Sequence, residues 1–113
     1  MKYFFYDQET QEGIDADDAA EGTEVEIVAA WNALTPTPGS FLGIFETDDK
    51  PTLQFMWEEE EDGFDKPWLD IPVPDRQGSY RKIVTREEAA QLLKQTIEGS
   101  DPTKIPGLDF EAW

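Results

Sequence analysis

Cysteine and histidine are both absent from this sequence of 113 residues. Without cysteine the chain forms no disulfide framework and no thiolate metal site. Without histidine it lacks the commonest general base and metal-ligating side chain. The three serines lie in no nucleophile-elbow pattern, and no glycine-rich phosphate-binding motif is present. We therefore predict that the protein is not an enzyme, and we assign it no catalytic residue, no metal and no cofactor.

Basic residues are also scarce, with nine Lys and Arg against 26 Asp and Glu, for a net charge of −17. Residues 1–65 hold 18 acids and only Lys2 and Lys50 as bases, so nearly all of the net charge lies there. This balance argues against nucleic acids and anionic membranes as partners, because both attract positive charge. It favours a basic protein partner. The competing interpretation is that the acids only keep the protein soluble.

No apolar run reaches the length of a membrane span, and the first residues do not resemble a signal peptide. We therefore expect a cytoplasmic protein. Four Trp and seven Phe are too many aromatic residues for a disordered chain. No linker or internal repeat divides the sequence, which indicates a single domain over residues 1–113. The oligomeric state is left open.

The strongest local pattern lies in residues 80–99 and predicts a helix over about 85–98. Thr85 and Glu88 form a capping box, and Gly99 stands where a left-handed residue ends a helix. Its apolar positions repeat with helical spacing, which predicts one buried face. These positions are Ala89, Leu92, Leu93 and Ile97.

Alternating and aromatic residues predict strands at 2–6, 40–45, 52–57 and 80–84, with 40–57 forming a hairpin. Residues 24–34 could be a strand followed by a helix, and we favour a helix throughout, with Thr23 as its N-cap. Residues 7–22 read as a mobile acidic excursion. Three prolines make a short or edge strand the expectation for 64–74. The predicted fold is α+β, an antiparallel sheet of about four or five strands with two helices packed on one face.

The tail after Gly99 is expected to be irregular, but its apolar residues indicate that it docks on the body of the protein. Trp31 and Trp57 fall on predicted apolar faces and are interpreted as core residues. Trp68, which follows a proline, is less easily assigned to the core. It is a candidate anchor for a partner, since Trp is enriched among the residues that dominate interfaces.

An unbroken acidic run after the hairpin is the candidate partner-binding site. Five consecutive carboxylates cannot be buried, so the run is exposed. It is either an interface for a basic protein or simply a solvated turn. A role in binding a hard cation or as paired carboxylates is the less favoured interpretation. The candidate partner-binding residues are Glu58, Glu59, Glu60, Glu61, Asp62, Asp65 and Trp68.

The layout of residues 40–113 resembles that of a known family. It combines a Gly-Ser-Phe-Leu hairpin whose second strand is Leu53-Gln-Phe-Met-Trp57, the helix containing Glu88-Ala-Ala-Gln-Leu-Leu, and a tail with Pro and Trp. In this respect the chain is similar to small immunity proteins of bacterial polymorphic toxin systems, of the type found beside deaminase or nuclease toxins. It departs from them in the longer stretch between the last helix and the final Trp.

The resemblance implies a non-catalytic binding protein that neutralises a cognate nucleic-acid-targeting toxin by covering its active site. An acidic surface suits such a toxin, whose cleft is basic. The alternatives are an acidic mimic of nucleic acid that inhibits a DNA-binding enzyme, as some phage proteins do, and a small regulatory or structural domain.

Overall fold

In the computed structural model, which describes residues 1–58 and 66–113, the chain forms an α+β fold. The described residues contain one antiparallel sheet of eight strands, so the predicted four or five strands were too few. The α+β class and the two helices were predicted correctly. The strands are β1 (Lys2–Tyr6), β2 (Gly13–Ile14), β3 (Ala20–Glu21), β4 (Phe41–Phe45), β5 (Leu53–Met56), β6 (Trp68–Val73), β7 (Gly78–Ile83) and β8 (Asp109–Ala112). The helices are α1 (Glu24–Ala33) and α2 (Arg86–Ile97).

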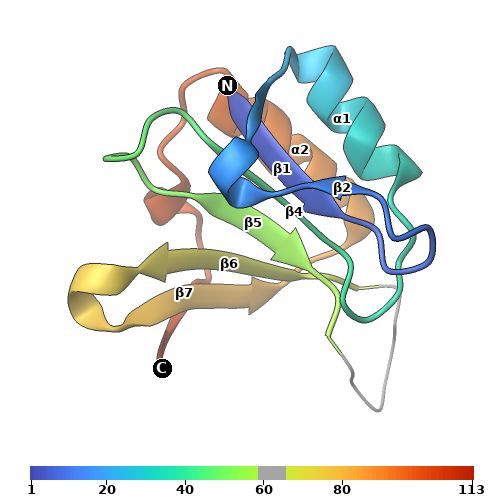
Figure 1. The fold of residues 1–113 in the computed structure, drawn as a ribbon. Coiled ribbons are helices and arrows are strands. Elements are labelled where there is room, and N and C mark those ends of the chain that lie inside the picture. Colours follow the sequence, from blue (N-terminus) through green and yellow to red (C-terminus); the bar gives the residue numbers. More distant parts are fainter. Residues whose placement is uncertain (59–65) are drawn as a thin grey trace.

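The strands follow the order β2-β1-β4-β5-β6-β7-β8, with β3 also paired to β1 (Figure 1). The acidic excursion at 7–22 is therefore not the predicted mobile loop, since β2 and β3 both pair with β1. The carboxylate of the buried Asp7 shapes this turn. Its Oδ1 accepts the N–H groups of Glu9 (2.9 Å) and Thr10 (3.2 Å), and its Oδ2 accepts that of Thr35 (2.9 Å).

Strand β6 spans six residues and lies between β5 and β7, so the expectation of a short or edge strand for this segment was wrong. Proline is tolerated because β6 is central along only part of its length. Its pairing with β5 ends at Asp70, whereas its pairing with β7 continues to Val73. Pro72 therefore lies where β6 has a neighbour on one side only, which is where a missing N–H costs least.

Both helices begin with the capping box that their sequences encode. Thr23 and Glu26 cap α1, and Thr85 and Glu88 cap α2, with side chain and backbone bonded reciprocally in each. In α2 Ala89 and Leu93 are fully buried as predicted, while Leu92 and Ile97 are only partly buried. Within the described residues, no helix is long and apolar enough to cross a membrane.

The two helices pack on the same face of the sheet, which we call the inner face. Trp31 of α1 lies at the centre of this core, as predicted, and stacks on the buried Trp57 with ring centroids 4.9 Å apart. The N–H of its indole donates to the carbonyl of Arg86, and the Arg86 guanidinium donates to the last carbonyls of α1, including that of Leu34 at 2.6 Å. Arg86 thus satisfies carbonyls at the C-terminal end of α1, of the kind that an α-helix leaves unpaired.

The tail is docked, as expected, but it is not irregular throughout, because it ends in β8. Ile105 and Leu108 pack against the core, and Phe110 lies edge-on to Tyr80. Gly78 makes room for β8: a Cβ there would lie 2.6 Å from the carbonyl oxygen of Glu111. A residue without a side chain is therefore required for β8 to join the sheet.

Candidate protein-binding surface

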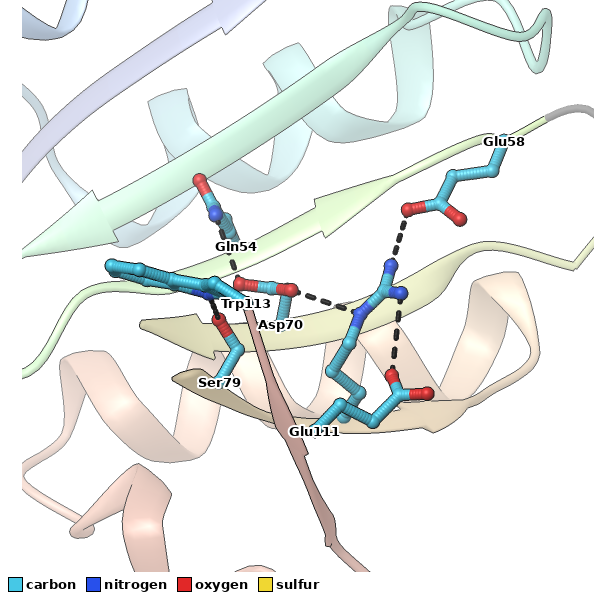
Figure 2. Close-up of polar contacts among 7 residues, drawn as sticks. Gln54, Glu58, Asp70, Ser79, Glu111 and Trp113 are labelled. Carbon is cyan, nitrogen blue, oxygen red and sulfur yellow. Dashed lines mark hydrogen bonds and ion pairs between the residues drawn. The ribbon is translucent and has the colours of Figure 1, made fainter. Parts of the chain in front are cut away.

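The other face of the sheet, which we call the outer face, has neither of the two helices packed on it. Because side chains alternate along a strand, the residues of this face follow from the strand register. Figure 2 shows part of the outer face, with the helices behind the sheet. The described residues of this face include Phe4, Tyr6, Phe41, Gly43, Phe45, Gln54, Met56, Trp68, Asp70, Ser79, Arg81, Ile83 and Glu111.

The half of the outer face formed by β1 and β4 is aromatic. The ring of Phe4 lies across Gly43, where a Cβ would come within 2.3 Å of it. The rings of Phe41 and Phe45 flank Phe4, with centroids 6.2 and 6.3 Å away. Phe4 is buried by these neighbours although no helix covers it. This half of the surface is therefore apolar and closely packed.

The half formed by β6, β7 and β8 is built around Arg81 (Figure 2). Its guanidinium forms ion pairs with Asp70 (Nε to Oδ2, 2.9 Å), Glu111 (Nη1 to Oε2, 3.4 Å) and Glu58. The other oxygen of Asp70 accepts the side-chain amide of Gln54 at 3.1 Å. The guanidinium carbon also lies 4.5 Å from the ring centroid of Trp68, a cation–π geometry. One arginine is thus held by three carboxylates and an indole.

This cluster carries excess negative charge. Burial lowers the pKa of Arg81, but the hydrogen bond and charge of Glu58 and the charges of Asp70 and Glu111 outweigh that effect and hold the pKa above its ordinary value. The Arg81 and Asp70 side chains are only 18% and 11% exposed, whereas those of Glu58 and Glu111 are 40% and 54% exposed. The negative charge that Arg81 does not balance is therefore accessible from solvent.

Trp113 borders the same cluster and is 72% exposed, so its predicted docking holds only in part. Its indole N–H donates to Ser79 Oγ at 3.0 Å, and its backbone N–H donates to the carbonyl of Gln77 at 2.9 Å. The ring is therefore both exposed and held in place. A depression of about 370 Å³, which we call the Trp113 depression, lies beside it. It is lined by Glu58, Asp70, Ser79, Arg81, Glu111, Ala112 and Trp113.

Two of the predicted partner-binding residues lie together in this region. Glu58 forms an ion pair with Arg81, and Arg81 stacks on Trp68, which is partly buried rather than exposed. The remaining predicted residues lie outside the described part of the chain. They are Glu59, Glu60, Glu61, Asp62 and Asp65.

Sequence reasoning missed Asp70, Arg81 and Glu111, which lie on three different strands. Asp70 was visible as a single acid in the alternating apolar stretch of Trp68–Val73, and Arg81 as a base between aromatic and apolar residues. A charged residue on a predicted strand can face a charge on a neighbouring strand. Assigning the pair would have required the register, which places Asp70 opposite Arg81.

In residues 1–58 and 66–113, no group of three or more acidic side chains is arranged to hold a metal ion. Comparison of the chain with protein-family models, curated proteins and solved structures finds no significant match. The case for a function therefore depends on the geometry and charge of the surface described above.

Proposed function

We propose that this chain is a non-catalytic binding protein that neutralises a basic protein partner, in the manner of an immunity protein acting on a nucleic-acid-targeting toxin. The observation that supports this most is the outer face, on which neither α1 nor α2 packs. It combines accessible carboxylates with a held, exposed Trp and with the exposed apolar Ile83, at 45%. Interfaces use such aromatic anchors for affinity and a charged rim for steering.

The charge distribution supports a basic protein as the class of partner. A net charge of −17 on 113 residues repels nucleic acid and accelerates encounter with a positive cleft. An enzyme that acts on nucleic acid presents such a cleft. Glu58, which begins the acidic run, is bonded to Arg81 at the edge of the outer face. Glu58 is therefore held beside the surface that we propose as the interface.

The test is association kinetics with the product of the neighbouring gene, measured at low and at physiological salt. Replacing Glu58–Glu61 with Gln should slow association markedly at low salt and change dissociation less, because steering acts on encounter. The wild-type rate should fall as salt shortens the Debye length to about 8 Å. A control with Glu12, Glu46, Glu87 and Glu98 changed to Gln removes the same charge from scattered exposed positions.

The control separates a local surface from total charge. If the acids serve solubility alone, association is indifferent to salt and to both sets of changes. If only total charge matters, the two variants slow association equally. Either result contradicts the proposal, which requires a larger effect of Glu58–Glu61 than of the scattered control.

A further inference from the structure

The two ends of the sheet differ in how they are protected against further pairing. An edge strand presents N–H and C=O groups to which another chain can add a strand, and very short edge strands reduce this risk. At one end, β2 and β3 have two residues each, and together they pair with both ends of β1. At the other end, β8 has four residues and pairs only with β7 (Figure 1). In the part of the chain that the structure describes, the edge of β8 is therefore the longer one.

A further open stretch lies within the sheet, and a proline blocks it. The pairing of β5 with β6 ends at Asp70, so residues 71–73 have no described strand on that side. The N–H of Val84 donates to the carbonyl of Pro67, which continues the register of β6 and β7 by one pair. Because the two kinds of pair alternate, the even-numbered residues of β6 direct their backbone groups toward β5. In the open stretch this residue is Pro72, which has no N–H to offer.

The free side of β8 has no such block. The N–H of Trp113 donates to the carbonyl of Gln77 at 2.9 Å, which continues the register of β7 and β8 by one pair. By the same alternation, Glu111 directs its N–H and C=O toward β7, whereas Phe110 and Ala112 direct theirs away. The register has no bulge here, and neither of these two residues is a proline. Complete backbone donors and acceptors thus face the position of an added strand.

The side chains of β8 determine which strand fits. Asp109 and Glu111 lie on the outer face, opposite Arg81 and Ser79, and both are exposed. Phe110 lies between them on the inner face and is half-buried. Opposite charges on neighbouring strands stabilise a pair, and like charges destabilise it. A strand that adds to β8 therefore gains stability from basic side chains on the outer face and from an apolar one beside Phe110.

The same carboxylates disfavour a second copy of this chain as the added strand. An antiparallel copy must match outward-facing residues with each other. Pairing Phe110 with Phe110 places Asp109 opposite Glu111. Pairing Phe110 with Ala112 places Glu111 opposite Glu111. Both registers oppose like charges, and each copy carries a net charge of −17. Charge complementarity therefore favours a basic protein.

From these observations we infer that β8 accepts a strand of the basic protein partner, which extends the sheet. The added strand runs antiparallel to β8 and alternates basic and apolar side chains, with the basic ones on the outer face. Its main chain pairs with the free N–H and C=O groups of Phe110 and Ala112, and its alternating side chains provide specificity. The inference rests on the proposed function, and it specifies the structural element that the partner presents.

The probe for this inference is the peptide acetyl-Lys-Val-Arg-Val-Lys-amide, titrated into the full ¹⁵N-labelled chain and followed by NMR. The backbone N–H signals of Phe110 and Ala112 should shift saturably and exchange more slowly with deuterium. N-methylation of both valines, whose N–H groups face β8 in the proposed register, should weaken binding at least about tenfold. N-methylation of both lysines, whose N–H groups face away, leaves the charge unchanged and should weaken binding less than about threefold.

A variant tests the same edge from the side of the protein. Ala112→Pro removes an outward N–H and should weaken peptide binding about fivefold, whereas Ala112→Val keeps that N–H and should bind like the wild type. The indole N–H signal of Trp113 reports its hydrogen bond to Ser79 and shows whether β8 stays in place. The N-methylated peptides need no change to the protein, so they decide the question even if Ala112→Pro displaces β8.

The inference is overturned if the two N-methylated peptides bind equally well, because the peptide would then bind through charge alone. It is also overturned if the Phe110 and Ala112 signals shift when the protein alone is concentrated, since a second copy would then occupy the edge. Ala112→Pro and Ala112→Val are also compared in association with the product of the neighbouring gene. If they associate alike while salt and the Glu58–Glu61 changes still slow association, only this inference fails and the proposed function stands.

Discussion

Replacing Arg81 with Met should destabilise the fold by at least about 3 kcal/mol. Removing one partner of a buried ion pair costs roughly 3–5 kcal/mol, and an exposed pair contributes about 0–1 kcal/mol. The pair with Asp70 is nearly buried, so its loss falls toward the upper range. The pairs with Glu58 and Glu111 are half-exposed, so each should contribute only about 0–1 kcal/mol. The cation–π contact with Trp68 adds about 0.5–1 kcal/mol.

The assay is urea unfolding followed by tryptophan fluorescence, with the midpoint and slope compared between variants. Arg76→Met is a matched control on the same β6–β7 hairpin. Arg76 is exposed and lies 4.1 Å from the ring centroid of Phe110, and it forms no ion pair with a described residue. It should cost less than about 1 kcal/mol.

A double-mutant cycle isolates the central pair. Asp70→Asn removes the carboxylate charge, so in that background Arg81→Met should cost at least about 1 kcal/mol less than in the wild type. If Arg81→Met is no more destabilising than Arg76→Met, or if the cycle shows no coupling, the ion-pair cluster does not stabilise the fold as argued.

Four further changes test the scaffold, each by urea unfolding. Thr85→Ala should cost about 0.5–2 kcal/mol through loss of the α2 cap, and Leu93→Ala about 2–5 kcal/mol through a core cavity; equal costs would refute this packing. Gly78→Ala should cost about 1–3 kcal/mol and release β8, seen as loss of the Trp113 indole signal position. Burial raises the pKa of Asp7, but the N–H groups of Thr35, Thr10 and Glu9 outweigh it and hold the pKa below its ordinary value. At pH values between that lowered pKa and about 3.9, the unfolded chain therefore binds more protons than the folded chain. The wild type should exceed Asp7→Asn in stability by its full margin above about pH 5. This margin should shrink as the pH falls through the lowered pKa.

The features that the sequence predicts well are those determined by residues close together in the sequence. The capping box of Thr85 and Glu88 and the left-handed Gly99 are local, and both occur in the structure. The core roles of Trp31 and Trp57 follow from the apolar faces of single elements. Such features need no knowledge of which strands are neighbours.

The features that sequence reasoning missed depend on pairing between distant segments. Strand β8 is short and charged, and it forms only because Gly78 lets it approach β7. The pairing of Asp70 with Arg81 depends on the register of β6 and β7. The acidic run drew attention to Glu58, but the arginine that holds it lies 23 positions away in the sequence. The candidate site is therefore a product of topology.

The central claim is that the outer face, and not the helical side, meets the partner. Two exposed apolar residues provide matched positions for a photo-crosslinking side chain: Ile83, 45% exposed on the outer face, and Val25, 77% exposed on α1. With benzoylphenylalanine at either position, the protein is irradiated together with the product of the neighbouring gene. Our account predicts a crosslinked complex from position 83 and none from position 25. Crosslinking from position 25 alone would contradict it.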